Sequence, residues 1–388
     1  MDARERPGET SGLAAARATL HHAGRSSVAP VRRGHGTNPG VTLRAVGKAH
    51  MKRLRRLLLA ASILPIAGGG TSAAPTPSPP QVSAPYPVGL SDQRITVNGV
   101  RRQYRVHVPA TLSGAPKAVV LVLHGGGGKG LDVATSGQHR LSVFRSVADR
   151  EGFVVVYPGG LPAKDPKGKP GWVDCRADNT TSSGADDVGF LAALVERVRT
   201  EYGLTTSRMF MTGGSNGAQM THAFAFNRAD LVAAVGTGSG SLPLNPKPGP
   251  CTTGPSRPLP ILILHGTGDT QMPWLGGCVA NVGGACNRGQ VISAEATRDR
   301  WLQINGLSGV SPSQTVIDGN KKDAGPGNRF DYAGPIPLQW WRLDGAGHTV
   351  PSQTVLVSPN PLTGIQNRDI EFAEVAWAFF APRLPANR

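Results

Sequence analysis

Short apolar runs alternate with helix-like segments along the chain from about residue 95 onward. The runs are bounded by polar or Gly-rich residues, as is typical of buried strands. The predicted strands are residues 95–97, 104–108, 118–123, 153–157, 209–211, 231–235, 261–264 and 338–343. Apolar residues at helical spacing predict helices at about residues 141–151, 187–202, 218–228, 294–304 and 368–380. This alternation predicts an α/β domain with a mostly parallel, twisted sheet and helices on both faces.

Two local signals refine this pattern. Asn98-Gly99 separates the first two predicted strands, and this dipeptide is the strongest short-range indication of a β-hairpin. Asp186 and Asp187 precede a segment with apolar residues at helical spacing, so both are expected to cap a helix and to complement its dipole.

The first ninety residues show the features of an export signal. Met51 is followed by a Lys/Arg-rich stretch, an apolar run at residues 57–67 and small residues up to Ala74. Residues 51–73 are therefore predicted to be a signal peptide, which indicates a secreted or periplasmic protein. Residues 1–50 are then an over-called or cleaved extension, and the Pro/Ser-rich residues 74–91 an extended linker. Residues 92–388 are predicted to form the α/β domain.

The charge distribution argues against a nucleic-acid partner. The formal net charge is +16, but residues 1–73 carry nine of these charges, and no basic run interleaved with aromatic residues follows. The four cysteines of an exported chain favour disulfides. Cys278 and Cys286 are close in sequence, and Cys175 would then pair with Cys251, although the sequence alone permits other pairings.

The segment Gly213-Gly214-Ser215-Asn216-Gly217 lies between a predicted strand and a predicted helix. This context fits the G-x-S-x-G nucleophile elbow, in which small residues let the strand and the helix cross closely. A simple turn is the alternative interpretation. A serine hydroxyl becomes a good nucleophile only when a base accepts its proton and an acid orients that base.

Asp269 and His348 are the candidates for these two roles, because each lies on a Gly-rich loop directly after a predicted strand. The order Ser, Asp, His is the one that open α/β sheets with a nucleophile elbow use. Asp344 competes with Asp269, but it precedes His348 by only four residues and could not easily reach the far side of the imidazole.

The run His124-Gly125-Gly126-Gly127-Gly128 follows the third predicted strand. Unobstructed backbone N–H groups at such a position can form an oxyanion hole together with the residue after the serine. We assign this role to the N–H groups of Gly126 and Asn216, with Gly127 as the alternative to Gly126. The run lacks the spacing of a phosphate-binding loop, and the cysteines lack metal-site spacing, so no cofactor or metal is expected.

With these residues in place, the chain resembles the secreted polyhydroxybutyrate depolymerase and feruloyl esterase family of α/β-hydrolases, from about residue 92 to the end. The resemblance rests on ordered motifs: the 124–126 loop, Tyr157-Pro158-Gly159-Gly160, Gly171-Trp172, Asp186-Asp187-Val188-Gly189-Phe190, the elbow, His265-Gly266-Thr267-Gly268-Asp269 and Gly345-Ala346-Gly347-His348-Thr349.

The resemblance implies an α/β-hydrolase fold and ester hydrolysis through an acyl-enzyme, with hydroxyalkanoate oligomers or feruloyl esters as substrates. It implies that Trp172 and Trp274 form pocket walls, although core packing is an equal alternative. The family often has an aromatic residue where this chain has Val350. Because the chain ends soon after its last predicted helix, a soluble ester is expected rather than bulk polymer. A peptidase of the same fold and a non-catalytic exported binding protein remain alternatives; stable membrane insertion is not expected.

Overall fold

The computed structural model describes residues 85–127, 130–164, 168–280 and 284–386. The predicted extension at 1–50, the predicted signal peptide at 51–73 and most of the predicted linker lie outside these residues. The end of the linker must be corrected: strand β1 already begins at Gly89, and the ring of Tyr86 is 4% exposed and packs against Tyr202. Residues 89–91 pair with β2 and are therefore part of the sheet. The Pro/Ser-rich composition of the residues before them gave no indication of this pairing.

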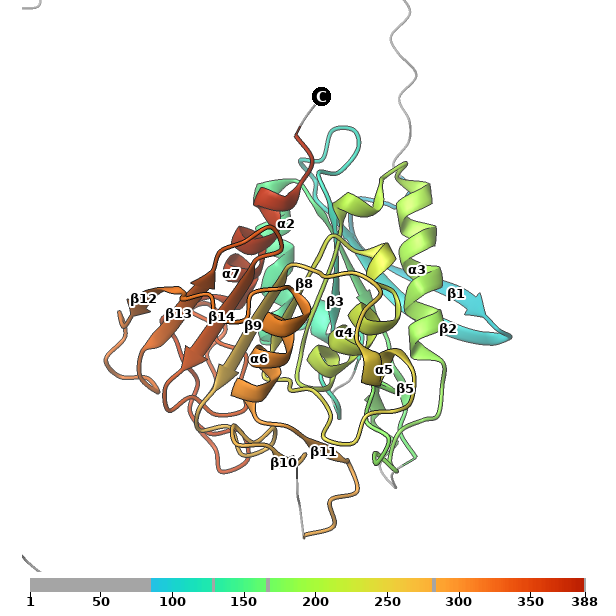
Figure 1. Ribbon diagram of the computed structural model, residues 1–388. Helices are drawn as coiled ribbons and strands as arrows, with labels where there is room; N and C mark the ends of the chain where they lie inside the picture. The colour runs from blue at the N-terminus through green and yellow to red at the C-terminus, as the bar shows by residue number, and fades with distance from the viewer. Residues whose placement is uncertain (1–84, 128–129, 165–167, 281–283, 387–388) are drawn as a thin grey trace, which may run out of the picture. The chain divides into compact units, whose positions relative to one another are not determined.

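The centre of the fold is a ten-stranded sheet with the order β1-β2-β4-β3-β7-β8-β9-β14-β13-β12 (Figure 1). The pairs from β4 to β14 are parallel, and both edges are antiparallel. The strands are β1 (Gly89–Val97), β2 (Val100–Val108), β3 (Val119–Leu123), β4 (Val154–Pro158), β7 (Met209–Gly214), β8 (Ala234–Gly238), β9 (Ile261–Gly266), β12 (Ser313–Ile317), β13 (Gly327–Tyr332) and β14 (Leu338–Leu343). Two small antiparallel pairs join β5 (Leu161–Pro162) to β6 (Pro170–Gly171) and β10 (Gly277–Cys278) to β11 (Gln290–Val291).

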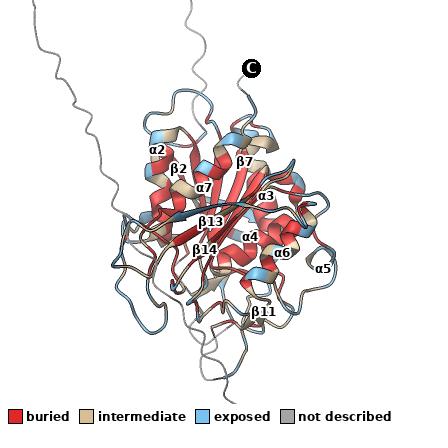
Figure 2. Ribbon diagram, turned by 60° about the vertical axis from the view of Figure 1, so that its left-hand side comes forward, coloured by how far each residue is buried: buried red, intermediate tan, exposed pale blue. Residues whose placement is uncertain are grey.

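Helices cover both faces of this sheet. The helices are α1 (Asp132–Thr135), α2 (Phe144–Glu151), α3 (Asp187–Glu201), α4 (Asn216–Asn227), α5 (Pro250–Thr253), α6 (Ala294–Ile304) and α7 (Phe372–Phe380). One buried apolar cluster joins α3, α4 and α6 to one face, and a second joins α2 and α7 to the other. Alternate residues of β3 enter the two clusters, as expected for a strand buried on both sides. Figure 2 shows buried residues along the central strands. The predicted fold class is confirmed.

Several predicted elements have different bounds. The hairpin is confirmed, with Asn98 (φ 50°) and Gly99 (φ 75°) both left-handed in its two-residue turn. The last helix begins at Phe372 rather than at residue 368, because the carboxylates of Asp369 and Glu371 accept hydrogen bonds from neighbouring loops. Asp186 caps α3 as predicted, through the N–H of Gly189.

Asp187 lies in the first turn of α3, but its carboxylate bonds to other segments instead of capping the helix as predicted. Its carboxylate forms a fully buried ion pair with Arg102 at 2.6 Å and accepts the N–H of Val173 at 2.7 Å. Burial raises the pKa of Asp187, while Arg102 acts against this shift. The pair fixes the segment that carries Trp172 against the first hairpin.

Candidate active site

Ser215 occupies the sharp turn between β7 and α4, with φ 56° and ψ −124°. A non-glycine residue in this region of backbone space is strained. The N–H of Ser215 donates to the carbonyl of Gly238 on the neighbouring strand at 2.8 Å, which holds the turn. A Cβ atom at Gly217 would lie 2.3 Å from the carbonyl oxygen of Leu123, so only glycine permits this crossing.

The structure brings Ser215, His348 and Asp269 together at the carboxyl ends of their strands. His348 Nε2 lies 2.8 Å from Ser215 Oγ, and His348 Nδ1 lies 2.8 Å from Asp269 Oδ2. The competing candidate, Asp344, does not take the place of Asp269, because its carboxylate pairs with Arg342 at 2.8 Å. Since a carboxylate only accepts hydrogen bonds, Nδ1 of His348 is the donor and Nε2 is free to accept the serine proton.

Asp269 is held by four groups. Its Oδ1 accepts the N–H groups of Gln271 at 3.0 Å and Met272 at 2.8 Å, and its Oδ2 faces both His348 and His265 Nε2, the latter at 3.4 Å. Burial acts to raise the pKa of Asp269, but the hydrogen bonds and charges of the two imidazoles outweigh it and hold the pKa well below the usual range. Asp269 is therefore a carboxylate at all ordinary pH values.

The glycine loop after β3 lies against the elbow. A Cβ at Gly126 would be 3.2 Å from Cβ of Asn216. The N–H of Gly127 already donates to Pro170 at 3.1 Å, which leaves Gly126 as the better oxyanion donor. Asn216 is the first residue of α4, where backbone N–H groups have no acceptor within the helix. The loop residue and the helix residue assigned from the sequence are thus in close contact, and their role as oxyanion donors stays a prediction.

His124 fixes this loop without lying in the catalytic chain of hydrogen bonds. Its Nδ1 donates to the carbonyl of Gly125 at 2.8 Å, and its Nε2 accepts the N–H of Gly160 at 2.9 Å. Burial lowers the pKa of His124 to about 4, so the imidazole is neutral and this pattern of donor and acceptor is stable at neutral pH.

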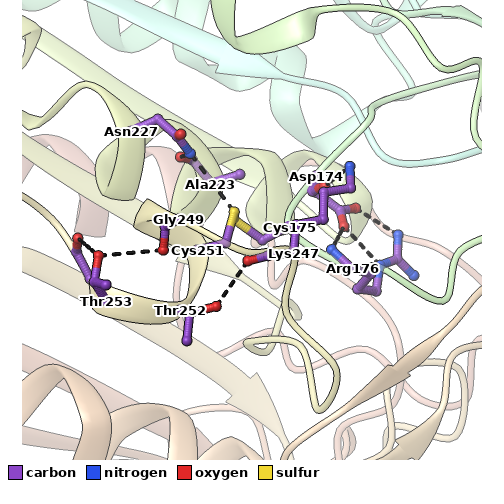
Figure 3. The surroundings of a disulfide bond; sticks show 11 residues. Asp174, Cys175, Arg176, Ala223, Asn227, Lys247, Gly249, Cys251, Thr252 and Thr253 are labelled. Carbon is purple, nitrogen blue, oxygen red and sulfur yellow. Dashed lines mark hydrogen bonds and ion pairs between the residues drawn. A yellow bond between two sulfur atoms is a disulfide. The ribbon is translucent and has the colours of Figure 1, made fainter.

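Sequence reasoning missed Asp174, which anchors the side chain of Asn216. Nδ2 of Asn216 donates to Asp174 Oδ2 at 2.8 Å, while Asn216 Oδ1 accepts the N–H of Trp172 at 2.7 Å. Arg176 pairs with the same carboxylate at 2.6 Å, and both side chains are buried (Figure 3). Cys175 lies between Asp174 and Arg176 in the chain, and its disulfide to Cys251 ties their loop to α5. Asn227, the last residue of α4, donates from Nδ2 to the sulfur of Cys251 at 3.8 Å. No sequence motif indicates that Asp174 anchors Asn216, because this contact depends on how the loop around Cys175 folds against α4.

The second disulfide joins Cys278 to Cys286, so the structure contains the two bonds expected from the sequence. This bond lies next to a small cluster formed by Met272, Val279 and Val291.

A cavity of about 300 Å³ opens over Ser215. Trp172 lines it and is 2% exposed, with its Nε1–H donating to the carbonyl of His124 at 2.8 Å. Val350 lines the cavity as well. The prediction that Trp274 forms a pocket wall must be corrected. Trp274 is absent from the described lining of the cavity and packs against His265 and Trp340 instead. The loop after Asp269 turns this indole toward the core, which its sequence position could not reveal.

Within residues 85–386, apart from the three short gaps, no helix has the length and apolar character needed to cross a bilayer. In the same part of the chain, no group of three or more His, Cys, Asp or Glu side chains is arranged to hold a metal ion.

The sheet order and the strand-turn-helix at Ser215 are those of the α/β-hydrolase fold. Residues 103–244 match the family model described as esterase PHB depolymerase, which agrees over this part of the chain with the resemblance indicated by the sequence motifs. A solved acetyl xylan esterase from Aspergillus awamori covers 75% of this chain and 99% of its own, with a TM-score of 0.50 and 20% identity. At that identity the likeness supports the fold alone.

Curated relatives carry esterase names. The chain is 30% identical to the bifunctional acetylxylan esterase/xylanase XynS20E of Neocallimastix patriciarum over 44% of this chain and 22% of that protein. It is 28% identical to the putative esterase NocK of Nocardia uniformis subsp. tsuyamanensis over 57% and 66%, respectively. It is 25% identical to feruloyl esterase B of Talaromyces funiculosus over 66% and 71%. The chain thus spans less than two thirds of the first two of these proteins.

Proposed function

We propose that this protein is an exported serine carboxylic-ester hydrolase. The observation that carries the proposal is the continuous chain of hydrogen bonds from Ser215 Oγ through His348 to Asp269, with both links at 2.8 Å. The nucleophile and base of such enzymes lie within hydrogen-bonding reach, and a third group orients the base. The esterase names of the relatives support the same reaction class.

In the proposed mechanism, Ser215 Oγ attacks the ester carbonyl while His348 Nε2 takes its proton. Asp269 holds the imidazole in the required tautomer and stabilises the imidazolium that forms. The N–H groups of Gly126 and Asn216 donate to the developing oxyanion. The imidazolium then protonates the departing alcohol, leaving an acyl group on Ser215. Water, deprotonated by His348, hydrolyses this acyl-enzyme and restores the serine.

The names of the relatives and the sequence motifs support a proposed substrate class. Acetylxylan and feruloyl esters are suggested by the names of the relatives, and hydroxyalkanoate oligomers by the matched family. Trp172 supplies an apolar wall beside Ser215, which suits an acyl chain or an aromatic acid. Export is proposed from the two disulfides, which form in oxidising compartments.

Hydrolysis of p-nitrophenyl acetate, methyl ferulate, hydroxybutyrate oligomers and a peptide p-nitroanilide tests this proposal, with the Ser215→Ala variant as the matched control. We expect hydrolysis of at least one ester by the wild type and a loss of about 10³-fold to 10⁶-fold in kcat in the variant. If only the anilide were cleaved, the protein would be a peptidase and the proposed esterase activity would be wrong. Equal rates for wild type and variant would refute the assigned nucleophile.

A further inference from the structure

The cavity over Ser215 is lined by an excess of positive charge. Arg140, Lys169, Arg176 and Arg288 all line it. Among the described residues of the lining, none is aspartate or glutamate. An ester pocket built only for neutral acyl groups has no need of such a surface, because apolar walls and a few polar groups suffice.

Among the residues that the structure describes, only Arg176 of these four cations has a carboxylate partner. Arg176 pairs with Asp174 at 2.6 Å, and both side chains are almost fully buried. For Arg140, Lys169 and Arg288, no acidic group of the described chain lies within ion-pair distance. Asp178 Oδ2 accepts the N–H of Gln290 at 3.1 Å and the side-chain amide of Asn245 at 2.9 Å, whereas its Oδ1 is buried without a hydrogen-bond partner.

Arg140 is the most unusual of the three. It begins the helical turn Arg140–Val143, whose next residue Leu141 also lines the cavity. Its Nε is buried and has no hydrogen-bond partner. Burial lowers the pKa of its guanidinium, yet an arginine does not lose its proton in a protein. A partly buried cation without a counter-ion is costly, and a bound anion would remove that cost.

We propose that this cavity selects esters that carry a carboxylate in addition to the scissile bond, with Arg140 as the principal partner of that carboxylate. Lys169 and Arg288 add to the local positive potential. A guanidinium can bind a carboxylate through two parallel hydrogen bonds and thereby orient the ester over Ser215. This inference rests on the proposed function, since it names the substrate class of the same site.

The test compares substrates that differ only in charge. For a carboxylate on the acyl side, mono-p-nitrophenyl adipate is compared with the p-nitrophenyl ester of the corresponding primary amide. For the alcohol side, acetoxyacetate is compared with acetoxyacetamide, measured by acetate release. The rates of the Ser215→Ala variant are subtracted from each. We expect kcat/KM of the wild type to favour the anion by about 10-fold to 100-fold in at least one pair.

Salt provides a measurement that needs no variant. Added sodium chloride screens charge over about 8 Å at physiological ionic strength. We expect kcat/KM for the preferred anionic ester to fall as salt is added, while the value for its neutral amide stays nearly constant.

Arg140→Gln, with Arg140→Lys as its conservative partner and Arg101→Gln as its control, identifies the residue responsible. Arg101 is exposed on β2 and does not line the cavity. We expect Arg140→Gln to lower kcat/KM for the anionic ester far more than for the neutral ester, so that the preference for the anion is lost. Arg140→Lys should restore part of this preference, and Arg101→Gln should change neither rate.

Two results would overturn the inference and leave the esterase intact: equal rates for anion and amide in both pairs, or an Arg140→Gln variant that loses the two substrates equally. A wild type that cleaves no ester in a Ser215-dependent manner would instead refute the proposed function, and the inference with it.

Discussion

His222 makes the stability of the fold dependent on pH in a way that can be calculated. It lies within α4 and is 1% exposed. Its Nδ1 accepts the indole N–H of Trp301 at 3.1 Å, so its Nε2 carries the proton and faces the carbonyl of Gly240 at 3.4 Å. Burial lowers the pKa of His222 to about 4, because a charged imidazole would lose its hydration there.

The sign follows from comparing the two states. In the unfolded chain the imidazole has a pKa of about 6.5, so between about pH 6.5 and pH 4 the unfolded state binds a proton that the folded state does not. The stability that the neutral His222 contributes is therefore complete above this window and is lost as the pH falls through it. Between about pH 7 and pH 5 the loss is about 2 kcal/mol.

His222→Gln isolates this contribution, because glutamine keeps an amide donor and acceptor but does not titrate. Urea unfolding followed by circular dichroism gives the free energy of unfolding of both proteins across this pH range. At neutral pH the variant should be less stable, by about 1 kcal/mol for the altered hydrogen bonds. That difference should shift by about 2 kcal/mol in favour of the variant at pH 5. A difference that stays constant with pH would refute the reasoning.

Three further predictions concern the elbow, the nearby disulfide and the acid. Gly217→Ala should lower the free energy of unfolding in urea by about 3 kcal/mol or more, whereas Gly137→Ala, at a position with open space around it, should lower it little. Similar losses in the two variants would contradict the close crossing of strand and helix. Replacing both Cys175 and Cys251 by serine opens a loop with a sequence separation of 76 and should lower the free energy of unfolding by about 4 kcal/mol; an unchanged value would show that the bond does not constrain the chain. Asp269→Asn should lower kcat by about 10⁴-fold with KM little changed, since the asparagine amide favours the wrong tautomer of His348. A loss in kcat below about tenfold would show that Asp269 does not orient His348.

The convergence of the candidate site could be predicted because its signals are local. Ser215 directly follows the glycines that end a buried strand, and Asp269 and His348 each follow a buried strand through a Gly-rich loop. The carboxyl ends of parallel strands meet at one edge of a sheet. The order of the three along the chain then restricts the choice. Close crossing of strand and helix explains why glycines flank the serine.

Other features depend on contacts between distant segments and left no local signal. Strand β12 is the mostly exposed edge of the sheet, and β13 lies between it and β14 with half of its residues only partly buried. Neither strand therefore carries the apolar run used to predict strands. Strand β8 extends to Gly238 through residues of little apolar character, which shifted its predicted end. The anchoring of Asn216 by Asp174 and the position of Arg140 both depend on how long loops fold over the elbow.

Covalent labelling tests the central claim most directly. The wild-type protein and its Ser215→Ala variant are treated with a fluorophosphonate at neutral pH, and the labelled peptide is identified by mass spectrometry. We predict a single phosphonylated residue, Ser215, in the wild type, and no labelling of the variant, because His348 and Asp269 activate this hydroxyl alone. Absence of labelling in the wild type, or equal labelling of the variant, would contradict the account.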